Sequence, residues 1–181
     1  MEWKGDDKWL RRLDEAEAFC RERGYCTSVV VLVDYSLPSS EPRFKVWSLA
    51  ERRVILQSLC AHGQGGGSTA ERPVFSNVEG SECSSLGRFV ITGKRRMHTL
   101  PDNCFEIDGL DATNSNARRR LLLIHPYHVV DDYDSGGMQG LIPIGPVSRG
   151  CFTISHRAMA ALEEIYDAQP CKQILVWAFC E

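Results

Sequence analysis

A cysteine follows a glycine turn late in the chain, in residues 145–151 (GPVSRGC), and the apolar run 121–124 upstream ends in His125. A cysteine attacks well only as the thiolate, so a nucleophilic cysteine needs a neighbouring base such as an imidazole. One loop can bring these two side chains together. The pattern therefore predicts acyl transfer with Cys151 as the nucleophile and His125 as the base.

The glycine before Cys151 strengthens this interpretation. Gly150 lets the backbone turn and leaves amide groups free to point at an oxyanion. Residues 152–154 (FTI) are typical of a strand, so Cys151 is expected at a rigid junction between turn and strand. Taken alone, a lone cysteine is more often a small buried apolar side chain, and a lone histidine is more often structural. His128 and His156 are rival bases, on a predicted loop and at the start of a predicted helix.

No cofactor and no metal are predicted. The glycine-rich residues 63–68 lack the Gly-Lys-Ser/Thr sequence of a phosphate-binding loop. Residues 131–136 lack the ligand spacing and the final glutamate of a calcium loop. The eight cysteines show no Cys-x-x-Cys spacing, which disfavours zinc. If Cys151 is a free thiol, the remaining cysteines cannot all form disulfides with one another.

Composition disfavours several classes of partner. The net charge of −3 does not favour nucleic acid, and the basic clusters at 94–96 and 118–120 are interpreted as solvated loop faces. No apolar run approaches the ~20 residues of a membrane-spanning helix, so no integral membrane segment is expected. Residues 1–12 lack the apolar core of a signal peptide, so either the protein stays in the cell or a leader has been removed. The oligomeric state stays open.

Apolar periodicity predicts a mainly β chain with an N-terminal helix and a late helix. Residues 7–23 and 155–167 have helical spacing. Strand-like runs cover residues 28–34, 43–49, 53–61, 87–92, 104–108, 121–125, 152–154 and 173–179, with long loops at 63–85 and 127–140. Short strands between long loops indicate a β-sandwich or a partly closed barrel. We divide the chain into an N-terminal helical extension, residues 1–27, and a catalytic domain, residues 28–181.

An ordered set of short segments carries a family resemblance. The segments are residues 33–40 (VDYSLPSS), 61–63 (AHG), 75–77 (FSN), 84–87 (SSLG), 108–110 (DGL), 116–118 (NAR), 124–125 (IH) and 148–151 (SRGC). In this order they resemble the catalytic domain of the murein L,D-transpeptidases of the YkuD-related type, from about residue 29 onward. The resemblance implies an L,D-transpeptidase-like β-sandwich or barrel.

The resemblance also implies a substrate and a mechanism. The donor would be a peptidoglycan stem peptide, and the acceptor would be the amine of a second stem peptide. Cys151 would form a thioester with an L-residue as a terminal D-amino acid leaves, with His125 as base and then as acid. The amides of Gly150 and Cys151 would form the oxyanion hole.

Three further residues are predicted to bind substrate on the same grounds. They are Ser148, Arg149 and His62. Arg149 stands where the family type often has an aromatic residue or histidine, and it could hold a substrate carboxylate. The chain also departs from the family type at residues 152–155 (FTIS) and at Pro126, where a glycine is usual.

Two alternatives stay open beside transpeptidation. In the first, water resolves the thioester, and the protein is an L,D-carboxypeptidase or endopeptidase. In the second, the protein is a catalytically inactive domain that binds peptidoglycan, and Cys151 is no more reactive than Cys171. If a leader has been removed, the expected location is the cell envelope or periplasm.

Overall fold

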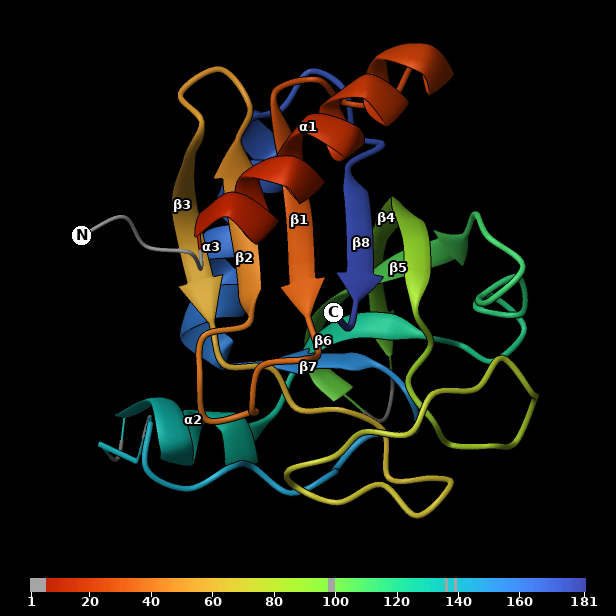
Figure 1. Cartoon of the computed structure of the whole chain (residues 1–181), viewed down its shortest axis with the longest axis vertical. Coiled ribbons are helices and arrows are strands. Elements are labelled where there is room, and N and C mark those ends of the chain that lie inside the picture. The colour runs from red at the N-terminus through yellow and green to blue at the C-terminus, as the bar shows by residue number, and fades with distance from the viewer. Residues whose placement is uncertain (1–5, 98–99, 136, 139) are drawn as a thin grey trace.

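A computed structural model describes residues 6–97, 100–135, 137–138 and 140–181. The described residues form three helices and eight strands (Figure 1). They are α1 (Asp6–Arg23), β1 (Val29–Asp34), β2 (Phe44–Ser48), β3 (Arg53–Ser58), β4 (Gly87–Met97), β5 (Leu100–Gly109), β6 (Leu123–Pro126), α2 (His128–Ser135), β7 (Phe152–Ile154), α3 (His156–Ala168) and β8 (Leu175–Phe179).

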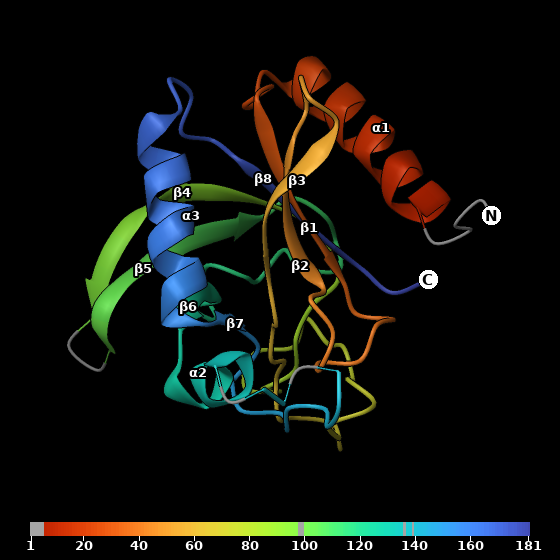
Figure 2. The ribbon, with the colours of Figure 1, turned by 90° about the vertical axis from the view of Figure 1, so that its left-hand side faces the viewer.

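All eight strands form one sheet in the order β3-β2-β1-β8-β4-β5-β6-β7. The pairs β1–β8 and β6–β7 are parallel, and the other neighbours are antiparallel. After β3 the chain crosses to β7, the strand at the other end of this order. There Ala61 pairs with Thr153 in β7, and Gly63 pairs with Ser148 in the turn before it. These bridges bring the two ends of the sheet together. The sheet is therefore a nearly closed barrel, as the crossing halves in Figure 2 show.

Strand β1 is buried along its whole length because both of its faces are covered. Val29, Val31 and Val33 face the main core, whereas Val30 and Leu32 face a second cluster. A strand covered on both faces is expected to be a continuous run of β-branched residues, and residues 29–33 (VVVLV) are one.

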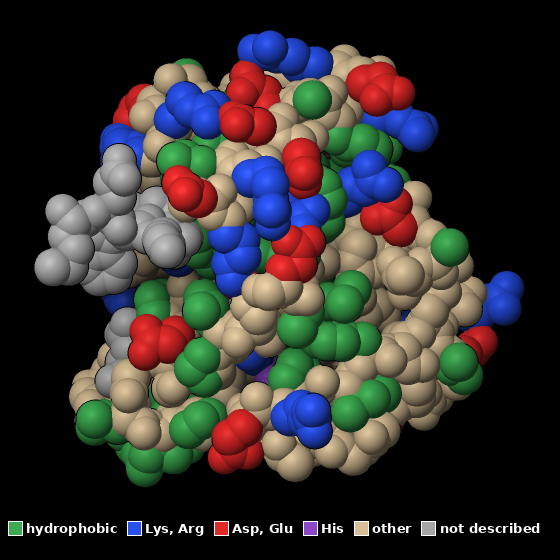
Figure 3. All heavy atoms as spheres, viewed as in Figure 1, with side chains coloured by type: hydrophobic (Ala, Val, Ile, Leu, Met, Phe, Trp, Pro, Cys, Tyr) green, Lys and Arg blue, Asp and Glu red, His purple; other side chains and the backbone are tan. Residues whose placement is uncertain are grey.

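The helices α1 and α3 lie on opposite faces of the sheet (Figure 2). α1 contributes Trp9, Leu13, Ala16 and Cys20 to the second cluster. Its outer side is covered by charged side chains of both signs (Figure 3), which form ion pairs such as Arg21–Glu17 and Arg52–Asp14. α3 contributes Ala158, Met159, Leu162 and Tyr166 to the main core. The predicted mainly β class with an N-terminal helix and a late helix is confirmed.

Two local predictions were wrong. The segment 127–140 was predicted to be a loop, but it contains α2, which is held by buried Val130 and by Asp131, whose carboxylate accepts from His156 N at 2.7 Å. The strand predicted for 121–125 begins only at Leu123. Leu121 has a φ of 52°, in the left-handed region, and this conformation interrupts an extended strand. The first difference involves a contact with His156, distant in sequence, whereas the turn at Leu121 is closed locally by hydrogen bonds from Leu121 N to Arg118 O and from Leu122 N to Ala117 O.

The division at residue 27 stays a prediction, although α1 packs closely on the sheet. Lys8 forms an ion pair with buried Asp34 at the end of β1, and Arg11 forms one with Glu181. No helix among the described residues combines the length and apolar character that a bilayer crossing requires.

The packing of α1 predicts that it shares the stability of the sheet. Leu13 is fully buried, so Leu13→Ala is expected to lower the free energy of unfolding by about 2–5 kcal/mol in one cooperative transition. Glu22→Ala, on the exposed side of the same helix, should change it by no more than about 0.5 kcal/mol. Urea unfolding followed by circular dichroism measures both. A sheet that unfolds at the wild-type urea concentration in Leu13→Ala would show that α1 is a separable extension.

Candidate active site

The turn before Cys151 has a backbone that requires glycine. Gly150 has a φ of 113°, and a Cβ added there would overlap Cys83 O. Ser148 Oγ accepts a hydrogen bond from Gly150 N at 3.2 Å and donates one to Cys151 O at 3.0 Å. The Ser148 hydroxyl therefore links the backbone of residues 150 and 151 and stabilises the turn. In this arrangement the Gly150 amide, predicted to face an oxyanion, is directed to Ser148.

The segment that follows β3 holds this turn in place. Val147 N donates to His62 O at 3.1 Å, and Gln64 N donates to Ser148 O at 2.8 Å. These main-chain bonds continue the pairing that closes the barrel. The nucleophile turn is therefore attached to the closure of the sheet.

The imidazole of His62 is fully buried, and the protein uses both of its nitrogens. Arg43 Nη2 lies 2.8 Å from His62 Nδ1, and His62 Nε2 lies 2.8 Å from Thr69 O. A guanidinium can only donate, so Nδ1 accepts and Nε2 carries the proton. Burial, with a smaller contribution from the Arg43 charge, lowers the pKa of His62 to about 4. His62 therefore holds the turn through its carbonyl while its ring is fixed in the interior. Its predicted contact with substrate stays a prediction.

His125 lies on β6 in a defined tautomer. Its Nδ1 lies 2.9 Å from the carbonyl oxygen of Pro126, which can only accept, so Nδ1 carries the proton. Nε2 is then left with its lone pair. Burial lowers the pKa of His125, so the ring is neutral at pH 7. A neutral imidazole with a free Nε2 is the form that acts as a general base.

The strands β6 and β7 carry His125 and Cys151 onto one face of the sheet. His125 pairs with Thr153 in a parallel register, and continuing that register places Cys151 beside Leu123. Side chains alternate along a strand, so Cys151 and His125 lie on the same side, about 7 Å apart along the strand direction. The structure thus places Cys151 directly before β7, the strand that pairs with the one carrying His125.

The Cys151 thiol is half-buried and donates to Leu121 O at 3.6 Å. Within the described residues it forms no hydrogen bond with His125. Removal from water raises the pKa of Cys151 to about 11, while the Leu123 amide and the Arg120 charge act in the opposite direction. In this state the thiol is protonated at neutral pH, so it must pass its proton to a base before it can attack.

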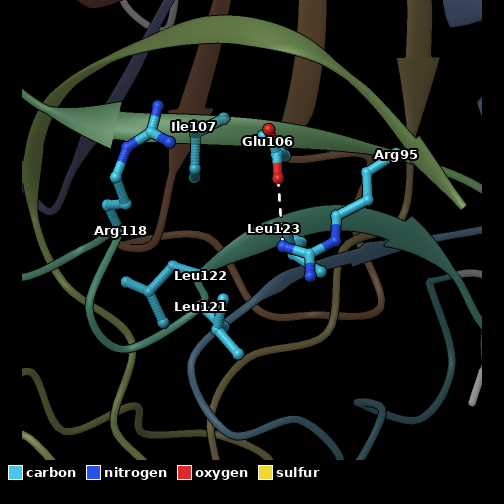
Figure 4. Close-up of a pocket in the computed structure, with 7 residues that line it drawn as sticks. All are labelled: Arg95, Glu106, Ile107, Arg118, Leu121, Leu122 and Leu123. Carbon is cyan, nitrogen blue, oxygen red and sulfur yellow. Dashed lines mark hydrogen bonds and ion pairs between the residues drawn. The ribbon is translucent and has the colours of Figure 1, made fainter. Parts of the chain in front are cut away.

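A small pocket opens beside the same segment (Figure 4). It has a volume of about 50 Å³, and its lining comes from β4, β5 and the turn into β6: Arg95, Glu106, Ile107, Arg118, Leu121, Leu122 and Leu123. Arg95 and Arg118 lie on opposite sides of it, the first paired with Glu106 at 3.0 Å and the second with Asp108 at 2.5 Å. Leu121, which accepts the thiol hydrogen bond, is thus part of the pocket wall.

The chain matches the family model of the L,D-transpeptidase catalytic domain over residues 9–173. The chain belongs to this family. It is also similar to the crystal structure of an L,D-transpeptidase from Xylanimonas cellulosilytica DSM 15894, with 16% sequence identity and a TM-score of 0.43, over 90% of this chain and 68% of that chain. No curated protein matches the chain. The family supports a peptidoglycan-modifying enzyme.

The other predicted residues of this L,D-transpeptidase domain are exposed or already have protein partners. The Arg149 side chain is 82% exposed and lies 3.3 Å from Glu82. His128 is exposed at the start of α2, and His156 Nδ1 lies 2.5 Å from Asp131. None of the eight cysteines, all of which lie in the described part of the chain, forms a disulfide. No group of metal-ligating side chains occurs among the described residues.

Sequence analysis missed one residue at this site. Residues 118–120 were interpreted as a solvated face, and Arg118 and Arg119 are indeed exposed. Arg120, however, is half-buried, and its guanidinium bonds to Ser76, Cys83 and Ser85. Nothing in three consecutive arginines distinguishes the one that turns inward.

The conformation of Gly150 predicts a strong effect of a methyl group. Gly150→Ala is expected to lower the stability by more than about 1 kcal/mol and to abolish activity, because a side chain strains the positive φ and meets Cys83 O. Gly145→Ala is a matched control, since no atom lies within 4 Å of the added Cβ. Thermal unfolding and product formation are to be compared for both. Equal stability and activity of the two variants would contradict the role of the Gly150 turn.

The neutral His62 predicts a pH dependence of stability. Its pKa is about 4 in the fold and 6.5 in the unfolded chain, so the unfolded chain binds more protons between these values. The contribution is fully present above pH 6.5 and is lost as the pH falls toward 4, by up to about 1.4 kcal/mol per pH unit. His62→Asn keeps an acceptor for Arg43 but does not titrate, so its free energy of unfolding should vary less with pH. Urea unfolding from pH 4 to 6.5 tests this, and equal slopes for both proteins would contradict it.

Proposed function

We propose that the protein is an L,D-transpeptidase that cross-links peptidoglycan stem peptides through a thioester on Cys151. The observation that carries this proposal is the neutral His125, which lies on the strand beside the one that follows Cys151. Its Nδ1 is bound to Pro126 O, and its Nε2 has no hydrogen-bond partner among the described residues. Family membership supports the same chemistry.

In the first half-reaction, the thiol turns from Leu121 O and gives its proton to His125 Nε2. The thiolate attacks the carbonyl carbon that joins an L-residue to a terminal D-amino acid. The C–N bond breaks as His125 returns the proton to the leaving amine. The acyl group remains on sulfur as a thioester.

In the second half-reaction, an amine of a second stem peptide attacks the thioester carbon. Its proton passes to His125, the C–S bond breaks, and the proton returns to the sulfur. A new amide bond links the two stems, and free Cys151 is regenerated. If water takes the place of the amine, the product is a shortened stem peptide and no cross-link forms.

Substrate binding is assigned to groups around the thiol. The Cys151 amide serves as an oxyanion donor, and the Gly150 amide joins it if the Ser148 hydroxyl releases it. Arg149 is exposed and can exchange Glu82 for a substrate carboxylate. The pocket wall formed by Leu121 and Leu123 is suited to the apolar part of a stem peptide. Because the substrate is cell-wall material, the domain is proposed to work outside the cytoplasm, in the envelope.

The first test is product analysis with purified disaccharide-tetrapeptide. Wild-type protein is expected to produce cross-linked dimers that mass spectrometry detects, and Cys151→Ala should produce none. Cys180→Ala is the matched control, because Cys180 is an exposed cysteine near the C-terminus, and it should retain wild-type yields.

Each other outcome is decisive. Shortened tripeptide without dimer, from wild type and not from Cys151→Ala, would replace the transpeptidase by a hydrolase with the same nucleophile. Equal products from wild type and Cys151→Ala would overturn the thioester mechanism. An unchanged substrate in every sample would favour a domain that binds peptidoglycan.

A further inference from the structure

The Arg120 guanidinium lies against the turn that carries Cys151. A Cβ placed on Gly150 would be 3.1 Å from Arg120 Nη2, so the guanidinium packs closely against the backbone of Gly150. Arg120 comes from the turn before β6, the same turn whose Leu121 carbonyl accepts the thiol hydrogen bond. The cation and the thiol acceptor are therefore positioned by adjacent residues.

Among the described residues, the groups that bind the Arg120 side chain are all uncharged oxygens. Nη1 donates to Ser76 O at 2.8 Å and to Ser85 Oγ at 2.7 Å, and Nη2 donates to Cys83 O at 2.5 Å. No carboxylate pairs with it in the part of the chain that the structure describes, whereas Arg118 pairs with Asp108. The charge of Arg120 is thus held in place but not neutralised.

The other titratable or charged groups around the thiol do not supply such a charge. They are Tyr35 after β1, Glu82 and Cys83 in the long loop, Cys104 on β5, His125 on β6, Arg149 in the turn, and the ion pairs Arg95–Glu106 and Arg118–Asp108 at the pocket that Leu121 lines. The pKa of Tyr35 and that of Cys104 are raised, chiefly by burial, so both are neutral at pH 7. Burial also keeps His125 neutral, and Arg149 is exposed and paired with Glu82.

We propose that Arg120 is a positioning residue whose fixed positive charge stabilises the Cys151 thiolate and the negative charge that develops during acyl transfer. The guanidinium lies beside Gly150, the residue before Cys151, and an unpaired cation next to a half-buried sulfur favours the anionic form of that sulfur. The same field acts on an oxyanion formed next to the turn, where water is partly excluded. This inference rests on the proposed function for its role in turnover, but its effect on the thiol does not require substrate.

The test compares the alkylation rate of Cys151 by iodoacetamide at pH 8 in four proteins. Arg120→Gln removes the charge, Arg120→Lys keeps it, and Arg119→Gln removes an exposed charge from the same turn. Digestion and mass spectrometry give the rate at Cys151, with the rate at Cys180 in the same sample as the internal reference. Circular dichroism and thermal unfolding establish that each variant is folded.

Arg120→Gln is expected to slow alkylation of Cys151 about tenfold, because a nearby opposite charge shifts a pKa by one unit or more. Arg120→Lys should recover at least half of the lost rate on a logarithmic scale, and Arg119→Gln should match the wild type. If Arg120 only held the long loop, lysine and glutamine would slow Cys151 equally. Equal rates in Arg120→Gln and wild type, or equal losses in Arg120→Gln and Arg120→Lys, would overturn the proposal.

The two proposals can fail separately. If wild-type protein forms no product from disaccharide-tetrapeptide but Arg120→Gln still slows alkylation, the transpeptidase proposal fails and the charge effect stands. If product forms and alkylation does not depend on Arg120, the transpeptidase proposal stands and the charge effect of Arg120 is overturned.

Discussion

The pairing of residues 61–63 with Ser148 and Thr153 is the interaction on which the site depends. It joins the two ends of the sheet and fixes the turn that carries Cys151. Without it, β7 would be an open edge of the sheet, and the turn would be attached to the sheet only through this short strand. Barrel closure removes that edge, and here it also defines the position of the nucleophile.

A buried arginine supports this closure. Arg43 donates from Nε to Cys60 O at 2.8 Å and from Nη1 to Leu37 O at 3.0 Å, and its guanidinium lies 4.9 Å from the Tyr35 ring centroid. These bonds hold the chain as it leaves β3. A buried cation is tolerated when its donors are satisfied, and here the third nitrogen, Nη2, donates to His62 Nδ1. The hydrogen bonds of Arg43 and His62 thus fix the position of the chain between β3 and the turn more strictly than apolar packing alone would.

Two arginines therefore serve one site in different ways. Arg43 lies beneath the closure, bonded to carbonyls and to an imidazole that stays neutral. Arg120 lies beside the turn, with its charge unpaired in the described part of the chain. In both cases backbone carbonyls satisfy the donors and leave the charge itself intact. In the role proposed for Arg120, the positive charge near Cys151 is held in place by hydrogen bonds that also hold the fold.

The sequence by itself determined the mainly β class, the two long helices, and the glycine turn before Cys151. These features depend on local periodicity and on glycine, which act over a few residues. Only the tertiary structure decided that α2 forms within 128–135, that Leu121 bends the start of β6, and which of three consecutive arginines turns inward. The first and the last of these outcomes involve contacts with distant residues, namely His156 for α2 and Ser76, Cys83 and Ser85 for Arg120, which local pattern does not encode. The lowered pKa values of His125 and His62 likewise follow from burial, which exists only in the folded protein.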